Sequence, residues 1–287
     1  MNHVPANSRR APRMAFLLIL LCLGTLCNAQ AADFLDLSSA VVVIRPGELH
    51  AAEKTAAIVL VEEVEKRAGI RLPVSTEFPE QQTAIAITAA REVPVWSRPI
   101  PASPGEGAPE SRPEGFRLYA DLQSEPATTV WVLGADARGA LFGVGALLRN
   151  LDWANGQLRV STALNLSTSP AYSIRGHQIG YRTAANSWDA WTPEQFEQYF
   201  RELAFFGINS IENIPFQDDR PTPVMRKSRA EMNRRMSEIC QRYGLDYWVW
   251  TPADFDLKDA AVRSKALENS CGSGRTGITV ITASPLE

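Results

Sequence analysis

Polar and aromatic side chains gather in the second half of the chain, where three predicted strands end. Tyr181, Arg182 and Asn186 lie at the end of the first of these strands, and Trp250 and Asp254 lie at the end of the third. An indole ring offers a flat apolar face to a pyranose ring, while guanidinium, amide and carboxylate groups can bond its hydroxyls. These residue types in this arrangement indicate a site that binds a sugar.

Two charged residues lie inside strands that are otherwise apolar, namely Arg175 and Glu212. Burying a charge without a partner is costly, so each needs a counter-ion or a ligand. We predict that both line the substrate pocket, with Glu212 able to pair with Arg175. Asp218 and Asp219 could act as acid and base, but the surrounding Asp, Pro and Thr residues are more typical of a solvated turn.

Several other kinds of chemistry have no motif in this sequence. It contains no Walker A loop and no Gly-x-Ser-x-Gly elbow, and its three histidines lie too far apart for metal-ligand spacing. The formal net charge is −3, with no basic block beyond the N-terminus. The sequence therefore predicts no cofactor, no metal and no nucleic-acid partner.

The elements that would position the sugar-binding residues alternate between strand and helix. Short connections join them, as is usual in βα units, and parallel strands require such crossovers. The expected strands are residues 174–181, 210–216 and 245–250, and the expected helices are 192–206 and 228–243. Because active sites of (β/α)8 barrels lie at the carboxyl ends of the strands, we predict that residues 169–262 open such a barrel.

A smaller α/β layer domain is predicted for residues 32–168. It combines alternating strands and helices with one antiparallel strand pair. The expected strands are residues 41–44, 83–88, 115–121 and 128–133, and the expected helices are 51–67 and 137–151. Gly139, Gly143 and Gly145 lie within the second helix, so we interpret them as small residues for packing and not as a dinucleotide loop.

The N-terminus has the composition of a targeting segment. Arg9, Arg10 and Arg13 precede the apolar run 14–23, and small residues follow. The run is too short to span a bilayer of about 30 Å, so residues 1–31 are predicted to be a cleaved signal peptide. We expect an exported protein, periplasmic or extracellular, with no membrane partner after cleavage. Whether Cys240 and Cys271 pair is left open, because their spacing indicates no disulfide framework.

The end of the chain changes character. Residues 269–277 are polar and glycine-rich, and a β-branched run follows them. A frameshift, a truncated gene or a disordered end would each explain residues 263–287 as an aberrant tail. A closed barrel needs about 250 residues, so the expected fold is an α/β layer domain followed by an incomplete (β/α)8 (TIM) barrel.

One segment resembles a known family. Residues 134–143 carry Gly134, Arg138, Gly139 and Gly143 in the pattern of the domain that precedes the barrel in bacterial family 20 β-N-acetylhexosaminidases, with related domains in α-glucuronidases and α-N-acetylglucosaminidases. Arg175 with the next glycine is similar to the Arg-Gly that opens the first barrel strand of family 20. The resemblance implies that Arg175 holds sugar hydroxyls in the innermost subsite, and that the chain is part of a glycoside hydrolase.

The chain also departs from that family. Ile179 and Gly180 stand where family 20 has Leu-Asp, so a neighbouring glycosidase family fits equally well. Family 20 chemistry uses an Asp-Glu pair after the fourth strand, and no Asp-Glu dipeptide occurs in this chain. We therefore assign no catalytic residue and expect the chain to be inactive. The alternatives are a non-catalytic carbohydrate-binding module and a structural or interaction protein; the oligomeric state is left open.

Overall fold

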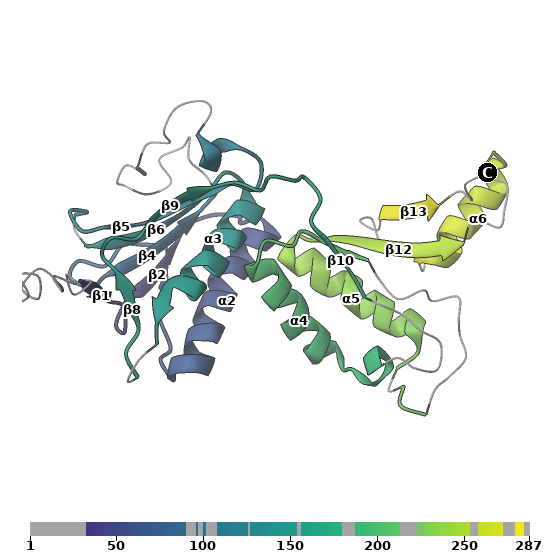
Figure 1. The fold of residues 1–287 in the computed structure, drawn as a ribbon, viewed down its shortest axis with the longest axis horizontal. Coiled ribbons are helices and arrows are strands. Elements are labelled where there is room, and N and C mark those ends of the chain that lie inside the picture. Colours follow the sequence, from purple (N-terminus) through teal and green to yellow (C-terminus); the bar gives the residue numbers. More distant parts are fainter. Residues whose placement is uncertain are drawn as a thin grey trace, which may run out of the picture. The chain divides into compact units, whose positions relative to one another are not determined.

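A computed structural model shows a mixed α/β fold with several sheets (Figure 1). It describes residues 33–89, 96, 100–101, 108–125, 127–153, 156–179, 187–212, 223–225, 227–252, 258–271 and 279–283. The described helices and strands belong to one compact unit, Phe34–Glu287. The predicted signal peptide lies outside the described residues. Within the described part, no helix combines the length and the apolar composition needed to cross a membrane.

A six-stranded sheet forms the centre of the N-terminal half. Its strands follow the order β3 (Val74–Ser75), β2 (Val41–Ile44), β4 (Ala84–Thr88), β6 (Thr129–Gly134), β5 (Phe116–Asp121) and β9 (Asn165–Thr168). The strands β3, β2, β4 and β6 run parallel, and β5 is antiparallel to both β6 and β9. The predicted strands and their antiparallel pair are therefore confirmed.

Each face of this sheet is covered by apolar side chains. The helices α2 (Ala51–Ala68) and α3 (Ala137–Asn150) share one core with residues of one sheet face, including Val42, Ile85 and Leu118. On the other face, Trp131 packs with Trp96 and Phe78. Burial on both faces explains why the central strands are runs of β-branched residues without a polar alternation.

The sequence did not predict a second, three-stranded sheet. It contains β1 (Phe34–Asp36), β8 (Arg159–Ser161) and β7 (Leu151–Asp152), all antiparallel. A short 3-10 turn, η1 (Pro109–Ser111), lies between β4 and β5 in the sequence. The strands of this sheet are short, and their sequences carry no clear period of two.

Local signals set the helix ends where the sequence predicted them. The side chain of Asp136 caps α3 by accepting from the Gly139 amide at 2.8 Å. Gly69 ends α2 with φ 69°, a left-handed conformation that favours glycine. Thr192 begins α4 (Pro193–Phe205) with a capping box that includes Gln195. Gly244 ends α5 (Arg229–Tyr243) at φ 66°.

The C-terminal half contains a four-stranded parallel sheet, of which β10, β12 and β13 are labelled in Figure 1. Its strands are β10 (Gly176–Gln178), β11 (Ser210–Glu212), β12 (Asp246–Pro252) and β13 (Thr279–Ala283), in that order. The helices α4, α5 and α6 (Ala260–Cys271) fall between consecutive strands, and η3 (Ser187–Ala190) precedes α4. Each strand is hydrogen-bonded in parallel to the next. The predicted alternation of strand and helix is confirmed.

The structure differs from the expectation for residues 263–287. The helix α6 extends to Cys271, and β13 pairs with β12 from Thr279 to Ala283. Regular structure therefore continues past the third predicted strand, within the segment that the sequence analysis described as an aberrant tail. The β-branched run of β13 hydrogen-bonds to the edge that β12 would otherwise leave open. Cys240 is a free, buried thiol in α5, so it does not pair with Cys271.

The three glycines of α3 bring its neighbours very close. A methyl group on Gly143 would meet Cγ1 of Val132 at 2.7 Å, and one on Gly139 would overlap the carbonyl oxygen of Gly115. Gly145 faces α4, where a methyl group would meet Cα of Phe205 at 2.5 Å. The interpretation of these glycines as packing residues is confirmed, with one of the three packing on a helix.

Candidate functional site

Residues of the parallel sheet face its two sides alternately. His177, Ile211 and Tyr247 lie in register across three strands and point toward the helices. Nε2 of His177 lies 2.7 Å from the hydroxyl of Tyr199 in α4, and the hydroxyl of Tyr247 donates to Asn233 in α5 at 2.7 Å. Because side chains alternate along a strand, the next residue in each strand points to the face opposite the helices.

That opposite face carries three side chains in one row, from Gln178, Glu212 and Trp248. Neighbouring strands lie about 4.8 Å apart, so an amide, a carboxylate and an indole lie side by side. Gln178 is exposed, and the other two are half-buried. The indole Nε1 of Trp248 is buried, with no hydrogen-bond partner within the described part of the chain. We call these three residues the inner row.

The inner row suits a ligand with several hydroxyl groups. Glu212 can accept hydrogen bonds, Gln178 can both donate and accept, and Trp248 adds a donor and a flat apolar face. Among the described residues, no group of three or more histidine, cysteine or acidic side chains could hold a metal ion. Of the predicted site residues, Glu212 belongs to the row; sequence reasoning missed Gln178 and Trp248, although the strand period could have identified them.

Most of the other predicted site residues cannot be placed. Tyr181, Arg182, Asn186 and Asp254 lie outside the described residues, as does the Asp218–Asp219 pair. The backbone of Trp250 belongs to β12, but its side chain lies outside what the structure describes. Near the carboxyl ends of β10, β11 and β12, the side chains of the inner row are therefore the basis for describing a site.

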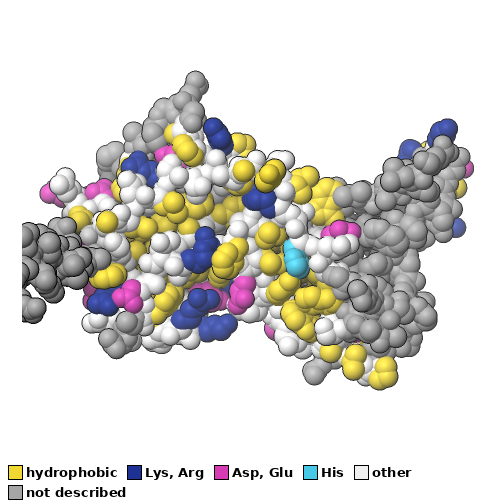
Figure 2. Space-filling model, viewed as in Figure 1, with side chains coloured by type: hydrophobic (Ala, Val, Ile, Leu, Met, Phe, Trp, Pro, Cys, Tyr) yellow, Lys and Arg dark blue, Asp and Glu magenta, His cyan; other side chains and the backbone are white. Residues whose placement is uncertain are grey.

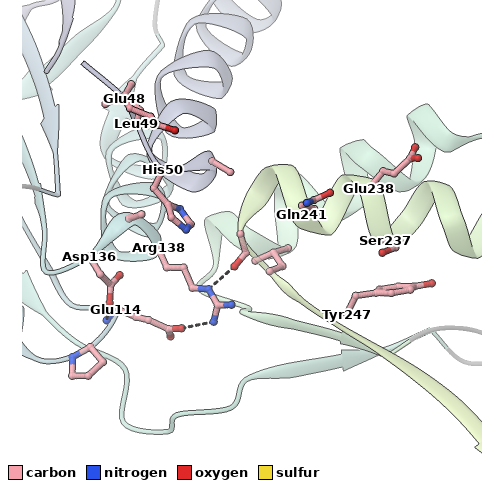
Figure 3. A pocket seen from close by; sticks show the side chains of 15 residues that line it. Glu48, Leu49, His50, Glu114, Asp136, Arg138, Ser237, Glu238, Gln241 and Tyr247 are labelled. Atoms are coloured by element: carbon pink, nitrogen blue, oxygen red, sulfur yellow. Dashed lines mark hydrogen bonds and ion pairs between the residues drawn. The ribbon is translucent and has the colours of Figure 1, made fainter. Parts of the chain in front are cut away.

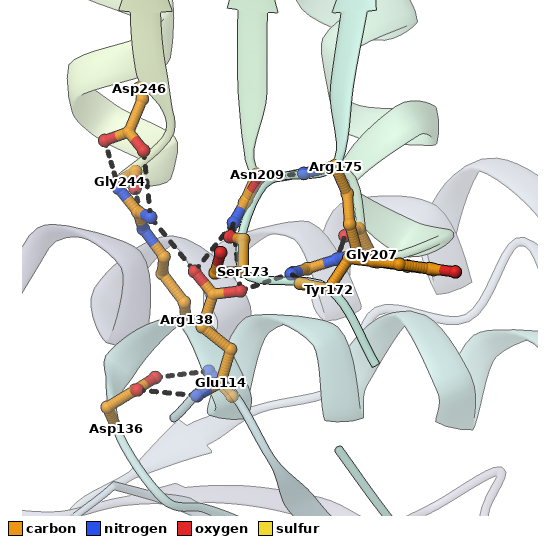
Figure 4. Close-up of polar contacts among 11 residues, drawn as sticks. Glu114, Asp136, Arg138, Tyr172, Ser173, Arg175, Gly207, Asn209, Gly244 and Asp246 are labelled. Carbon is orange, nitrogen blue, oxygen red and sulfur yellow. Dashed lines mark hydrogen bonds and ion pairs between the residues drawn. The ribbon is translucent and has the colours of Figure 1, made fainter. Parts of the chain in front are cut away.

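Arg175 does not join the inner row. Its Nε donates to the carbonyl oxygen of Gly207 at 2.6 Å and its Nη1 to that of Tyr172 at 2.8 Å. Nη2 forms an ion pair with Glu114 (Figure 4), and the guanidinium lies 5.4 Å from the ring centre of Phe142. The prediction that Arg175 pairs with Glu212 is wrong.

The strand period explains this correction. Arg175 precedes His177 by two residues, so it shares the helix side of the sheet with His177 and not the inner side. Its position directly before β10 also places it at the amino end of the strand. Pockets of (β/α)8 enzymes form at the carboxyl ends. The geometry thus argues against the sugar-binding role that the family resemblance implied for Arg175.

Glu114 is the centre of the polar network that holds Arg175. Its carboxylate also accepts from Nη1 of Arg138 at 3.0 Å and from Nδ2 of Asn209 at 3.0 and 3.1 Å (Figure 4). Burial alone would raise the pKa of Glu114, but the hydrogen bonds from Asn209, Arg175 and Arg138 outweigh it and hold the pKa below the usual 4.5. Glu114 has φ 59°, a left-handed conformation uncommon outside glycine.

This network joins the two halves of the described unit. Arg175, Asn209 and Asp246 lie directly before or at the start of β10, β11 and β12. Arg138 of α3 reaches the third of them, with Nη2 2.6 Å from Oδ1 of Asp246. Asp136 accepts from the amide of Glu114 at 2.8 Å. The motif residues that resemble glycosidase domains therefore work as a structural junction at the amino ends of the strands.

A cavity of about 870 Å³ opens beside this junction (Figure 3). Several of its charged side chains are already engaged: Arg138 with Glu114 and Asp246, Asp136 with two backbone amides, and Glu238 with Arg234. It lies at the amino ends of the strands, where barrel enzymes carry stability and not catalysis. The inner row is therefore the better candidate for a ligand site.

Two tryptophans near the predicted site are used for packing. Trp188 and Trp191 lie with ring centres 4.4 Å apart, and both contact Phe196 and Tyr199. The hydroxyl of Tyr199 reaches His177 on the neighbouring strand. These two half-buried indoles therefore pack against the aromatic side chains of α4.

We predict that His177 makes the stability of the fold depend on pH. Burial lowers its pKa below 6.5, so the unfolded chain binds the proton more tightly. The free energy of unfolding should therefore fall as the pH drops below about 6.5, and level off below the folded pKa. Urea unfolding followed by circular dichroism between pH 5 and 8 would measure this. His177→Asn should flatten this decline in the free energy of unfolding. His50→Asn is the matched control and should show the same decline as the original chain. Equal dependence of the free energy on pH in all three proteins would contradict the prediction.

Comparisons with known proteins identify a class of fold. No family model and no curated protein sequence matches this chain. Comparison with solved structures shows that the chain has a glycoside-hydrolase-like fold. It resembles a family GH115 4-O-methyl-alpha-glucuronidase with specificity for decorated arabinogalactans, at TM-score 0.52 and 16% identity over 76% of this chain. A GH20 exo-β-N-acetylglucosaminidase from Vibrio harveyi gives TM-score 0.49 and 14% identity over 77% of this chain.

This chain spans about a third of those proteins, 29% of the first and 34% of the second. At such identities the likeness concerns the fold alone. The fold is therefore of a kind found in a glycoside hydrolase of known structure, while membership of that class, and of family 20 in particular, stays a prediction.

Proposed function

We propose that this chain is the N-terminal portion of an exported glycoside hydrolase that acts on oligo- or polysaccharides. In this proposal, β10 to β13 belong to an incomplete (β/α)8 barrel, and the α/β domain precedes it. The observation that carries the proposal is the inner row, because Gln178, Glu212 and Trp248 bring sugar-binding groups together on the face that a closed barrel would turn inward. The fold similarity to an α-glucuronidase is in keeping with it.

A binding experiment tests the inner row. The purified chain is titrated calorimetrically with N,N′-diacetylchitobiose and with an oligosaccharide carrying 4-O-methylglucuronic acid. Hydrogen bonds to a charged group contribute about 1.5–3 kcal/mol, so Glu212→Gln should weaken binding by about tenfold or more. Trp248→Ala should weaken it too, because it removes the flat apolar face.

The matched control is Glu80→Gln, since Glu80 is exposed and far from the sheet in sequence. It should bind as the original chain does. The proposal fails if neither sugar binds, or if both variants of the inner row bind as tightly as the control.

We further propose that the 287-residue chain has no turnover, because it contains no Asp-Glu dipeptide of the kind that family 20 chemistry uses. Assays with aryl N-acetylhexosaminide and aryl glucuronide substrates should show no product above background. Sugar binding without turnover also fits the alternative of a carbohydrate-binding module. Product formation that is lost in Glu212→Gln would overturn the proposed inactivity.

A further inference from the structure

One carboxylate holds the bases of three neighbouring strands. Glu114 forms an ion pair with Arg175 and accepts from Nδ2 of Asn209 at 3.0 and 3.1 Å. These two partners directly precede β10 and β11. Glu114 also binds Arg138, whose Nη2 donates to Oδ1 of Asp246, the first residue of β12, at 2.6 Å. The positions of the three strand bases relative to one another therefore depend on Glu114 (Figure 4).

The backbone ladder of the parallel sheet begins at the same residues. The amide of Asn209 donates to the carbonyl oxygen of Arg175 at 3.1 Å, and the amide of Asp246 donates to that of Asn209 at 2.9 Å. Oδ1 of Asn209 also accepts from the amide of Arg175 at 2.9 Å. The side chains that Glu114 holds are thus anchored in the first hydrogen bonds that pair β10, β11 and β12.

Glu114 itself is fixed in place by its surroundings. Its amide donates to Oδ2 of Asp136 at 2.8 Å, and its φ of 59° lies in the left-handed region. The next residue, Gly115, is packed so closely that a methyl group there would meet the carbonyl oxygens of Pro109 and Arg112 at 2.8 and 2.9 Å. A left-handed residue other than glycine persists where its neighbours enforce it, and such residues gather at functional sites. Glu114 therefore provides a fixed point just before β5.

The inner row lies close to the strand bases that Glu114 holds. In β12, Trp248 follows Asp246 by two residues. The register places Gln178 and Glu212 level with Trp248. Two residues of a strand span about 7 Å. A displacement of one strand base would therefore change the spacing of the three side chains that form the row.

We infer that Glu114 is a positioning residue for the ligand site, because it holds the bases of β10, β11 and β12 in the arrangement that sets the spacing of the inner row. The inference rests on the proposed function, since it takes the inner row to bind a sugar. Glu114 acts through the strands, because it binds their amino ends while the row lies further along them. Hydrogen bonds weaken steeply when donor and acceptor are misplaced, so a ligand that bonds several members of the row requires this arrangement.

Glu63 in α2 is a matched carboxylate in a second charged cluster. Its side chain is fully buried and forms ion pairs with Arg67 at 3.0 Å and with Arg201 of α4 at 3.1 Å. Basic and acidic side chains lie close together over α2 (Figure 2). Like Glu114, Glu63 pairs with two arginines and connects the two halves of the described unit. Its partners belong to helices and not to strand bases, so Glu63→Gln separates a loss of stability from a loss of position.

A binding measurement tests the inference on the 287-residue chain. N,N′-diacetylchitobiose and the oligosaccharide with 4-O-methylglucuronic acid are titrated calorimetrically into the original chain, Glu114→Gln and Glu63→Gln. Glu114→Gln should weaken binding by about fivefold or more, the lower end of the usual range for coupling between two sites. Glu63→Gln should bind as the original chain does. Circular dichroism shows whether each variant is folded.

The indole Nε1–H signal of Trp248 provides a readout that needs no ligand. In nitrogen–proton correlation spectra, this signal is assigned by its absence from Trp248→Phe. It should shift in Glu114→Gln and stay in place in Glu63→Gln, because only the first change releases the strand bases. Glu114→Asp keeps the charge but shortens the side chain by one methylene. It should shift the signal too, with a smaller loss of stability, because the guanidinium groups keep their counter-ion.

Two results would overturn the inference: both Glu114 variants bind the sugars as the original chain does and leave the Trp248 signal in place, or Glu63→Gln has the same effects as Glu114→Gln. Failure of both Glu114 variants to fold would also overturn it, since the residue would then serve the fold as a whole. If neither sugar binds the original chain, the proposed function fails. The Trp248 signal then decides by itself whether Glu114 positions the inner row.

Discussion

Replacing Glu114 with glutamine is expected to lower the free energy of unfolding by about 3 kcal/mol, the lower end of the range for breaking a buried ion pair. The Glu114 side chain is 11% exposed and forms ion pairs with both Arg138 and Arg175. Glutamine keeps the shape but loses the charge, so two half-buried guanidinium groups would lose their shared counter-ion. Urea unfolding of the original chain and of Glu114→Gln at pH 7 measures the difference.

The pH dependence of that difference tests its electrostatic origin. The pKa of Glu114 is lowered in the folded chain from the usual 4.5. Its contribution to stability is therefore full above the unfolded value and is lost as the pH falls through the folded value. The two proteins should differ most near neutral pH and converge in acid, where the carboxyl is protonated in both states. Glu80→Gln should match the original chain throughout; an equal loss in this control would show that charge removal anywhere has the same effect.

The sequence predicted most of the regular structure because local chemistry determines it. Thr192, Asp136 and Gly69 act at their helix ends through side-chain caps and a left-handed turn, and each can be recognised from neighbouring residues alone. The β-branched runs of β2, β4 and β6 are buried on both faces and could be predicted from composition. The strands of the three-stranded sheet have no such signal, since contacts distant in the sequence form them.

The site was harder to predict because charge partners are not local. Arg175 and Glu212 are both charged residues in apolar strands, which suggested a pair, yet they occupy opposite faces of the sheet. The true partner, Glu114, lies 61 residues before Arg175, between η1 and β5. Its importance depends on a left-handed backbone and on Asn209 and Arg138, all brought together by folding. Counting by two from His177 would have placed Arg175 correctly.

The motif shared with glycosidase domains also has a physical explanation. Asp136, Arg138 and Gly139 act on the junction: one caps a helix, one bridges to the parallel sheet, and one allows a close approach to Gly115. A motif of this kind reports how two domains are joined, and it carries no information on which sugar is bound. This explains why the motif could indicate a class of fold, whereas the sugar-binding role of Arg175 was implied by a separate Arg-Gly match, against which the position of Arg175 argues.

The close contact between α3 and α4 leads to the second large effect. In an exposed helix, changing glycine to alanine adds about 1 kcal/mol of stability, because glycine has the greater backbone freedom to lose. At Gly145 we expect the opposite sign, a loss of about 1–3 kcal/mol. The new methyl group would lie 2.5 Å from Cα and 2.7 Å from the carbonyl oxygen of Phe205, both backbone atoms of a packed helix. Backbone cannot rotate away, so α4 would have to move.

Gly143 in the same helix provides the matched comparison. A methyl group there would meet Cγ1 of Val132 at 2.7 Å, a side-chain atom that can adjust. Gly143→Ala should therefore cost less than Gly145→Ala, and urea unfolding of both variants beside the original chain gives the order directly. If Gly145→Ala were as stable as the original chain, α3 and α4 would not approach as closely as described.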